Sequence, residues 1–273
     1  EQVHYPLSHA QKRLWVLHHM EESPIAYNML GAFMLEGKLD KQAFQKSFEE
    51  LIQRHEILRT SFITVEGEPR QKVLNKVEFH IEEIDLRVDK ETIPENGLLK
   101  QHAEQEAQTP FDLGKAPLLR VKLLHISETR YLLLSTIHHI IADGWSLDVL
   151  AGELSSLYKS HAFNEHNHLE TLPLQYKDYT AWHNELLESE GIRADREYWH
   201  SKLSGEIPVL DIPTDYTRPP VQTYQGSIHL FQISEALTED LNALNSRYGV
   251  SLFMSLMALV KVLFYRYTGQ EDI

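Results

Sequence analysis

Residues 138–144 are His-His-Ile-Ile-Ala-Asp-Gly, and they directly follow the apolar segment Tyr131–Ile137. That segment is short, apolar and contains β-branched residues, which predicts a strand buried on both faces. Successive side chains of a strand point to opposite faces, so His138 and His139 cannot readily converge on one ion or one substrate atom. One histidine is therefore expected to be structural and the other to be available for chemistry.

The end of this segment contains residue types that suit proton transfer and a turn. Histidine takes and returns a proton near neutral pH because its unperturbed pKa is about 6.5. Asp143 can orient an imidazole, or pair with an arginine and hold the turn, and the residues leave that choice open. Gly144 permits φ above zero, and Ser146 is expected to cap a helix that follows. The backbone amides at that helix start can polarise an oxyanion.

A satisfied polar strand end and an incomplete metal site are the alternative interpretations of the histidine pair. The sequence contains no cysteine and no His-Glu-x-x-His helix, and the second adjacent pair, His18 and His19, has no third ligand at a recognisable spacing. No metal site is predicted.

The composition favours a globular protein without nucleic acid or membrane as its main partner. The 273 residues are long enough for two ordinary domains or one large one, and the formal net charge of -14 would repel both polyanions. The longest apolar segment, Leu252–Tyr265, is interrupted by Lys261 and is too short to span a bilayer. The amino terminus does not resemble a signal peptide. We expect a soluble, cytoplasmic protein.

Strands and helices alternate along the chain, which predicts an α/β sandwich with a mixed sheet. Helices are expected after Ser8, Asp40, Ser146, Ser234 and Ser251 and over 90–109 and 176–203; strands are expected over 57–65, 77–86, 118–125, 131–138 and 226–233, with a return strand through Val73 and Leu74. The last helix, over 252–267, is apolar nearly all round and is expected to be buried.

Four segments, in order, match the motifs of one family. They are Leu-Ser-His-Ala-Gln-Lys-Arg-Leu-Trp at 7–15, Arg-His-Glu-Ile-Leu-Arg-Thr-Ser-Phe at 54–62, the histidine segment at 138–144, and Tyr-Lys-Asp-Tyr-Thr-Ala-Trp at 176–182. One such match would be weak, but four in the right order over most of the chain make chance a poor explanation. The chain resembles the condensation domains of nonribosomal peptide synthetases, and the first motif favours the type that accepts an L-configured donor.

The resemblance implies two chloramphenicol-acetyltransferase-like lobes in a V, with a tunnel between them that receives a carrier-protein arm from each side. Residues 1–165 are expected to form the N-terminal lobe with the HHxxxDG motif. A polar stretch at 160–170 marks the boundary, and residues 166–273 are expected to begin a second lobe that is truncated. Because the second lobe is expected to be incomplete, the chain by itself is expected to lack one wall of the tunnel and to be inactive.

The resemblance also implies amide formation, in which the amine of an acceptor aminoacyl thioester attacks a donor aminoacyl or peptidyl thioester. His139 is then the histidine closest to the reacting atoms, either as general base or as a positioning group, and His138 is structural. Asp143 is expected to form an ion pair with an arginine, with Arg59 as the first candidate and Arg13 as the second.

Further site residues follow from the same match. Gly144 is expected to act through its amide beside the reacting centre. Trp145, Ser146 and Tyr179 are candidates for the tunnel lining, although aromatic residues at helical spacing more often pack in a core, and Ser146 is more readily explained as a cap than as a nucleophile.

The implied partners are donor and acceptor peptidyl carrier domains and a neighbouring adenylation domain. No cofactor is expected to bind directly, because the substrates are tethered by 4'-phosphopantetheine on the carrier proteins. Three alternatives remain: an epimerisation domain, a coenzyme-A-dependent acyltransferase of the same fold, and a non-catalytic module that docks carrier proteins.

Overall fold

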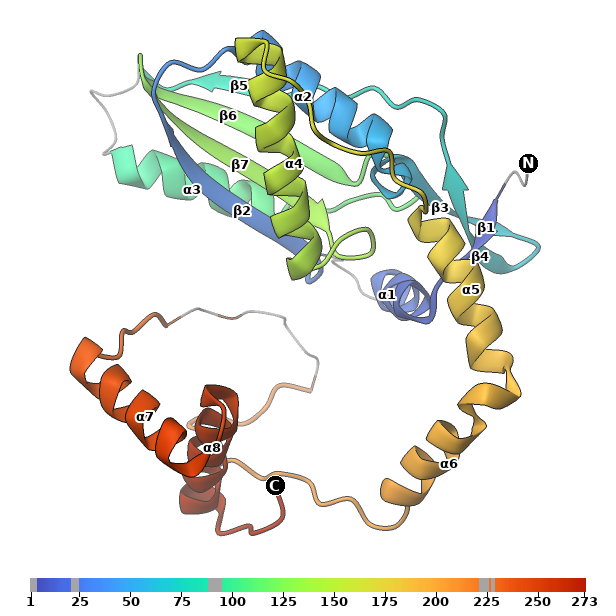
Figure 1. The fold of residues 1–273 in the computed structure, drawn as a ribbon, viewed down its shortest axis with the longest axis vertical. Helices are drawn as coiled ribbons and strands as arrows, with labels where there is room; N and C mark the ends of the chain where they lie inside the picture. Colours follow the sequence, from blue (N-terminus) through green and yellow to red (C-terminus); the bar gives the residue numbers. More distant parts are fainter. Residues whose placement is uncertain (1–3, 21–24, 88–94, 221–225, 227–228) are drawn as a thin grey trace. The chain divides into compact units, whose positions relative to one another are not determined.

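The computed structural model describes residues 4–20, 25–87, 95–220, 226 and 229–273 (Figure 1). The chain forms two compact units, Glu1–Ile192 and Arg193–Ile273. The boundary expected between residues 165 and 166 lies within the first of these units. The reason is that the helix over Tyr176–Glu188 is hydrogen-bonded to the first unit, through the Tyr176 hydroxyl and Ser8 Oγ at 3.0 Å.

The first unit alternates strands and helices, as the sequence predicts. Its elements are β1 (Tyr5–Pro6), α1 (His9–Met20), β2 (Asn28–Glu36), α2 (Lys41–Arg54), the 3-10 turn η1 (Glu56–Arg59), β3 (Thr60–Val65), β4 (Glu68–Val73), β5 (Glu82–Asp85), α3 (Glu95–Ala107), β6 (Leu119–Ser127), β7 (Arg130–His138), α4 (Gly144–Phe163), α5 (Tyr176–Glu188) and the 3-10 turn η2 (Glu190–Ile192). The predicted α/β class is confirmed.

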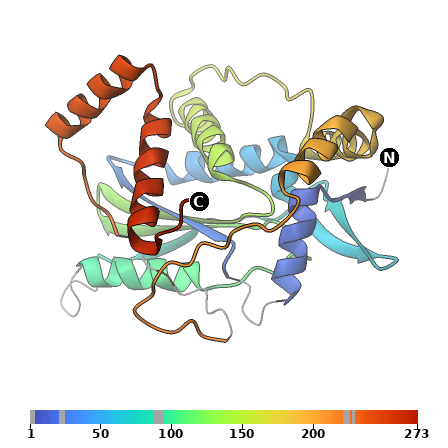
Figure 2. The ribbon, with the colours of Figure 1, turned by 90° about the horizontal axis from the view of Figure 1, so that it is seen from below.

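The main sheet has four strands in the order β2-β7-β6-β5. β7 pairs antiparallel with β2 and β6, whereas β5 pairs parallel with β6, so the sheet is mixed as predicted. The expected hairpin is the β6–β7 pair, with Leu123 opposite Leu133. Helices α2 and α4 lie over one face of this sheet and α3 covers the other (Figures 1 and 2). β1, β4 and β3 form a smaller antiparallel sheet.

Both faces of β7 are buried, which explains its nearly continuous apolar sequence. Leu133 belongs to the core cluster that includes Phe48 and Leu51 of α2. The next residue, Leu134, is 0% exposed and belongs to a second cluster on the other face, against which Leu99 of α3 packs. Burying each such leucine stabilises the fold by about 1.5–3 kcal/mol. The strand that ends in the histidine pair is therefore among the most firmly held parts of the unit.

Several predicted boundaries in the first unit are wrong. The strand expected over 57–65 begins as η1 and becomes extended only at Thr60, and the strand expected over 77–86 is limited to β5. Of the helix expected over 90–109, residues 90–94 lie outside the described residues and the remainder forms α3. Local apolar patterning locates these elements, but their ends are determined by pairing with neighbouring strands.

The helices described in the second unit are α6 (Arg193–Lys202), α7 (Glu235–Tyr248) and α8 (Leu252–Thr268). Ser234 and Ser251 cap α7 and α8, as the sequence predicts, and Gly269 ends α8 with φ of 70°. The strand expected over 226–233 is wrong, because residues 226 and 229–233 are not in a strand; residues 227 and 228 lie outside the described residues.

The expected burial of α8 is also wrong. None of its residues is buried, and Phe253 is 71% exposed. An apolar helix is buried only when a second layer covers it, and the described part of this unit contains no strand to form a sheet. Among the described residues no single helix is long and apolar enough to cross a membrane, and α7 and α8 meet those criteria only together, across a bend of 104°.

Candidate active site

The two adjacent histidines lie in different surroundings at the end of β7. His138 is 0% exposed, and its backbone amide donates to Leu118 O at 3.0 Å. Its Nδ1 accepts a hydrogen bond from the Ile140 amide at 3.0 Å, which fixes the start of the turn. The edge of the ring faces Phe111, with centroids 6.0 Å apart.

The environment of His138 keeps the ring neutral. Burial lowers the pKa of His138 to about 3, and the nearby His18 and His139 lower it further when they are protonated. Nδ1 is an acceptor, so in the neutral ring Nε2 holds the proton. A ring that does not titrate near neutral pH is suited to a structural role.

His139 has the opposite environment. Its side chain is exposed, while its backbone amide donates to Tyr27 O at 2.9 Å. Its Nδ1 lies 2.9 Å from Ala142 O. A carbonyl oxygen only accepts, so Nδ1 is the donor and the neutral ring has an unprotonated Nε2. Nε2 can therefore accept a proton or a hydrogen bond from a substrate.

His139 lies in a groove of about 380 Å³ formed within the first unit. The groove also contains four of the predicted site residues: Arg13, Asp143, Trp145 and Ser146. Its remaining lining comes from α1, the end of α2, η1, the turn after β7, α4 and the start of α5: Ala10, Gln11, Leu14, His55, Ile57, Leu58, Ile140, Ile141, Ala142, Val149, Leu150 and Tyr176. The first, second and third motifs and the first residue of the fourth thus meet at one site.

Three polar residues of the groove were not predicted as site residues: Gln11, His55 and Tyr176. The Gln11 side chain donates to Ile140 O at 3.4 Å and so links α1 to the histidine turn. Tyr176 reaches the groove from α5, and burial raises the pKa of its hydroxyl. Gln11 and Tyr176 stand in the first and fourth motifs, so their position in those motifs was the signal that could have identified them.

His55 forms a second polar cluster at the groove. Its Nε2 lies 2.6 Å from Glu153 Oε2 of α4, and the same carboxylate accepts from Arg54 Nε at 3.0 Å. Burial would raise the pKa of Glu153, but hydrogen bonds from Arg54 and His55 outweigh it and the pKa is lowered. This cluster joins the end of α2 to α4. No spacing in the sequence indicates Glu153, because it is almost 100 residues from its partners.

Asp143 caps α4, whereas the sequence placed the cap at Ser146. Asp143 Oδ1 accepts from the Ser146 amide at 2.8 Å and from Ser146 Oγ at 2.6 Å. Hydrogen bonds from the side chain and the backbone of Ser146 lower the pKa of the Asp143 carboxyl. The cap lies earlier in the chain than expected because an aspartate is as good a cap as a serine and precedes it.

The expected ion pair of Asp143 is not formed with either candidate arginine. Arg59 is 8% exposed; it donates to Leu74 O and lies 3.6 Å from Glu56. Arg59 therefore links η1 to the residue that follows β4. Arg13 is exposed and lines the same groove as Asp143, so the second candidate lies nearer to the site than the first.

The remaining predicted residues differ in their relation to the groove. Gly144 is the first residue of α4, and its φ is not positive, so the conformational freedom of a glycine is not used here. Its amide is in the first turn, where helix N–H groups have no partner within the helix. Trp145 is 82% exposed. Tyr179 is outside the groove lining and stacks on His183, with centroids 5.4 Å apart.

Among the described residues, no group of three or more His, Cys, Asp or Glu side chains could hold a metal ion. Besides His55, which is bound to Glu153, the groove contains the His139 imidazole with an unprotonated nitrogen and the start of α4, which Asp143 caps. The His139 imidazole can accept a proton, and free amides at the start of a helix can stabilise developing negative charge on an oxygen.

The family model named Condensation domain matches residues 1–273. Tyrocidine synthase 3 of Brevibacillus parabrevis is 42% identical over all of this chain, which spans 4% of that relative's length. Surfactin synthase subunit 1 of Bacillus subtilis (strain 168) is 38% identical, with 100% of the chain and 7% of the relative covered. The chain thus spans only a small part of the curated relatives it matches.

Solved structures show the same fold. The X-domain from teicoplanin biosynthesis matches with a TM-score of 0.84 and 25% identity over 98% of this chain and 58% of that one. The first condensation domain of the calcium-dependent antibiotic synthetase matches, in complex with a substrate analogue, with a TM-score of 0.80 and 20% identity, over 100% of this chain and 63% of the other. These likenesses confirm the predicted acetyltransferase-like fold.

The family inferred from four short segments is thereby confirmed. The groove of the first unit contains the histidine segment of that family. The chain belongs to the condensation-domain family of nonribosomal peptide synthetases.

Proposed function

We propose that this chain forms an amide bond between a donor aminoacyl or peptidyl thioester and the amine of an acceptor aminoacyl thioester. The observation that supports this most directly is the exposed His139, whose Nδ1 is held by Ala142 O while Nε2 is left available in the groove. His138, one residue earlier, is buried and neutral.

In the proposed reaction the acceptor amine attacks the donor thioester carbon. A C–N bond forms, the carbonyl oxygen takes up negative charge, and the C–S bond then breaks to release a thiol. His139 Nε2 accepts a hydrogen bond or the proton from the attacking amine, and holding the two groups together supplies much of the rate. In this proposal the amide of Gly144, at the positive end of α4, donates a hydrogen bond to the developing oxyanion.

Asp143 has a supporting part in this proposal. By capping α4 it fixes the helix start that presents the Gly144 amide, with Ser146 as its hydrogen-bond partner. Trp145 is placed at the rim of the groove as a contact for incoming substrate. Tyr179 lies outside this groove, and we propose that it lines the substrate tunnel elsewhere.

The substrates are proposed to arrive on 4'-phosphopantetheine arms of donor and acceptor carrier domains, next to an adenylation domain in a cytoplasmic synthetase. The relatives include tyrocidine and surfactin synthases, and one matching structure is a four-domain nonribosomal peptide synthetase bound to AMP and glycine, at 25% identity and a TM-score of 0.81. We also propose that the donor is L-configured and that the boundary between the two lobes lies near residue 165. The epimerisation alternative is not favoured, because the matching family is the condensation family.

The test uses the full-length protein that contains this chain, a donor carrier loaded with an L-aminoacyl group and an acceptor carrier loaded with a second amino acid. Mass spectrometry of the acceptor carrier should detect a dipeptidyl thioester. Appearance of a D-aminoacyl group without dipeptide would instead establish epimerisation. Faster acyl transfer from free coenzyme A thioesters than from the carrier would establish a soluble-substrate acyltransferase.

A further inference from the structure

The Tyr176 hydroxyl is a polar group of the groove that the proposed reaction does not yet use. Tyr176 is the first residue of α5, is half-buried and lines the groove together with His139. Its hydroxyl oxygen lies 3.0 Å from Ser8 Oγ, which belongs to the residue before α1. Because both groups are hydroxyls, the direction of this hydrogen bond decides whether Tyr176 keeps a proton for a ligand.

The surroundings of Ser8 determine that direction. Ser8 is 2% exposed, and a buried hydroxyl without an acceptor is costly. Ser8 Oγ accepts from the Gln11 amide at 3.2 Å, which occupies a lone pair and leaves the Ser8 proton to be placed. Among the described residues, the Tyr176 oxygen is the acceptor bonded to Ser8 Oγ. Ser8 therefore donates to Tyr176, and Tyr176 keeps its own proton unshared.

The unshared Tyr176 proton is available to a ligand in the groove. The described residues provide no hydrogen-bond acceptor for it, and the groove is the space that this side chain lines. Burial raises the pKa of the Tyr176 hydroxyl, and the negative charge of Asp143 also raises it. Tyr176 therefore stays protonated at neutral pH and can serve as a hydrogen-bond donor.

The residues on either side of Tyr176 hold the start of α5 in place. The Gln175 side chain donates to Arg54 O at 3.0 Å and accepts from the Glu56 amide at 3.0 Å. Lys177 Nζ donates to the Glu56 carboxylate. The Tyr176 hydroxyl is thus in position before a substrate binds, and a donor already in position stabilises charge without a cost of reorganisation.

The proposed reaction develops negative charge on one atom, the carbonyl oxygen of the donor thioester. Preorganised donors stabilise such an oxygen, and tyrosine hydroxyls are among them. His139 cannot supply this hydrogen bond, because its Nδ1 proton is bound to Ala142 O and its Nε2 is an acceptor. Tyr176 is a neutral donor in the same groove, so it complements His139 rather than duplicating it.

We propose that the Tyr176 hydroxyl donates a hydrogen bond to this carbonyl oxygen, alongside the Gly144 amide, and that the bond strengthens as the oxygen becomes charged. When the C–S bond breaks, the oxygen returns to a neutral carbonyl, and the phenolic proton stays on Tyr176 throughout. The identity of the oxygen rests on the proposed function, whereas the unshared proton in the groove does not. Tyr176 is in this proposal a catalytic residue.

The test compares variants of the full-length protein that contains this chain. Tyr176→Phe removes the proposed donor but also leaves the buried Ser8 hydroxyl without its acceptor. Ser8→Ala breaks the same hydrogen bond and keeps the Tyr176 hydroxyl. The double variant differs from Ser8→Ala only in that hydroxyl, so this pair isolates the hydroxyl even where Tyr176→Phe alone folds poorly.

With both carriers loaded, Tyr176→Phe should lower kcat for dipeptide formation about 100-fold and change KM much less, because the hydrogen bond is strongest in the transition state. Ser8→Ala should keep kcat within about threefold of the unmodified protein, and the double variant should be about 100-fold slower than Ser8→Ala. If the hydroxyl only ties α5 to α1, Ser8→Ala will be as slow as Tyr176→Phe.

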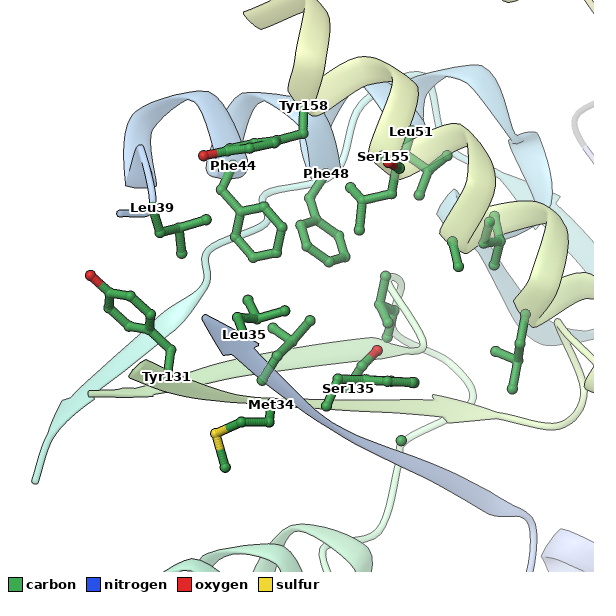
Figure 3. Close-up of a pocket in the computed structure, with 18 of the residues that line it drawn as sticks. Met34, Leu35, Leu39, Phe44, Phe48, Leu51, Tyr131, Ser135, Ser155 and Tyr158 are labelled. Carbon is green, nitrogen blue, oxygen red and sulfur yellow. The ribbon is translucent and has the colours of Figure 1, made fainter. Parts of the chain in front are cut away.

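Tyr131→Phe is a matched control, because it also removes the hydroxyl of a hydrogen-bonded tyrosine. The Tyr131 hydroxyl donates to Glu128 O at 3.4 Å. Tyr131 lines another cavity, between the main sheet and helices α2 and α4 (Figure 3), and lies on β7 about 20 Å from the end that bears His138. The rate of dipeptide formation by Tyr131→Phe should equal that of the unmodified protein.

A second readout does not require catalysis. Calorimetry measures the binding of a dipeptide phosphonamidate, whose anionic P–O⁻ group stands in for the charged oxygen, and of the corresponding neutral dipeptide. The unmodified protein and Ser8→Ala should prefer the phosphonamidate. Loss of the Tyr176 hydroxyl should reduce that preference at least about tenfold, because the hydrogen bond is made to a charged group.

A double variant with the same kcat as Ser8→Ala, or with the same preference for the phosphonamidate, would overturn the inference. A rise in KM at unchanged kcat would show that the hydroxyl only binds substrate and would overturn its catalytic role. Hydroxyl-dependent binding of the phosphonamidate without dipeptide formation by the unmodified protein would refute only the proposed function. Dipeptide formation that is independent of the hydroxyl would refute only this inference.

Discussion

The two neighbouring histidines at the end of β7 lie in opposite environments. On one side His138 is buried, accepts a hydrogen bond from its own turn and has a pKa of about 3. On the other, His139 is exposed in the groove with Nδ1 bound to Ala142 O. The difference shows that two identical neighbouring residues at a strand end can have opposite environments, one buried and one exposed.

Loss of His138 should have the largest effect on stability. His138→Ala removes a fully buried ring and leaves the Ile140 amide without its acceptor, which should lower the free energy of unfolding by about 3 kcal/mol. Urea denaturation of the variant and the unmodified chain measures this. If the loss of unfolding free energy is no larger than that of His9→Ala, a control at an exposed site, then His138 has no structural role.

The same residue predicts a pH dependence of stability. Its pKa is lower in the folded chain, about 3, than the unperturbed value of about 6.5, so below pH 6.5 the unfolded chain binds the proton that the folded chain refuses. Stability therefore falls as the pH falls from about 6.5 towards 3, with about 2 kcal/mol lost between pH 7 and pH 5.

The check is denaturation at both pH values in unmodified, His138→Gln and His139→Gln chains. His138→Gln should remove the loss of about 2 kcal/mol of stability between pH 7 and pH 5, whereas His139→Gln should still show it. Equal pH dependence in all three chains would show that His138 titrates normally.

Asp143 distinguishes a helix cap from a buried ion pair. Asp143→Ala should cost about 1 kcal/mol of unfolding free energy, and Asp143→Asn only a few tenths, because asparagine also caps helices. Breaking a buried ion pair would cost about 3–5 kcal/mol in either variant. Thermal unfolding of both variants distinguishes the helix cap from the ion pair. A large loss of stability in Asp143→Asn would support the ion pair with an arginine that the sequence suggested.

Gly144 should have the smallest effect on the fold. A Cβ at this position would meet nothing within 4 Å, and the backbone conformation suits any residue, so Gly144→Ala should change stability by less than about 0.5 kcal/mol. The same variant in the full-length protein should reduce dipeptide formation if substrate occupies that space. An unchanged rate of dipeptide formation would show that a glycine is not required at position 144.

The sequence was sufficient for the parts of the fold determined by local pattern. The β6–β7 hairpin and the caps at Asp40, Ser234 and Ser251 follow from apolar alternation and from side chains next to their own helices. The separation of His138 from His139 follows from the period of a strand.

Contacts between distant segments could not be predicted in this way. Nothing local shows that Glu153 meets His55, that Tyr176 reaches the groove, or that Arg59 is taken by Glu56 and Leu74 O. The start of α4 was misplaced because two nearby residue types can both cap a helix, and only the hydrogen bond from the Ser146 amide decides between them. The exposure of α8 depends on whether a second layer covers it, which the apolar sequence of one helix does not specify.

The most direct test of the division between the two histidines is a paired measurement on His139→Ala. In the full-length protein with both carriers loaded, its rate of dipeptide formation should fall at least about 100-fold, while the free energy of unfolding of the chain stays within about 0.5 kcal/mol. Dipeptide formation at the unmodified rate, or a loss of stability as large as that of His138→Ala, would contradict the account.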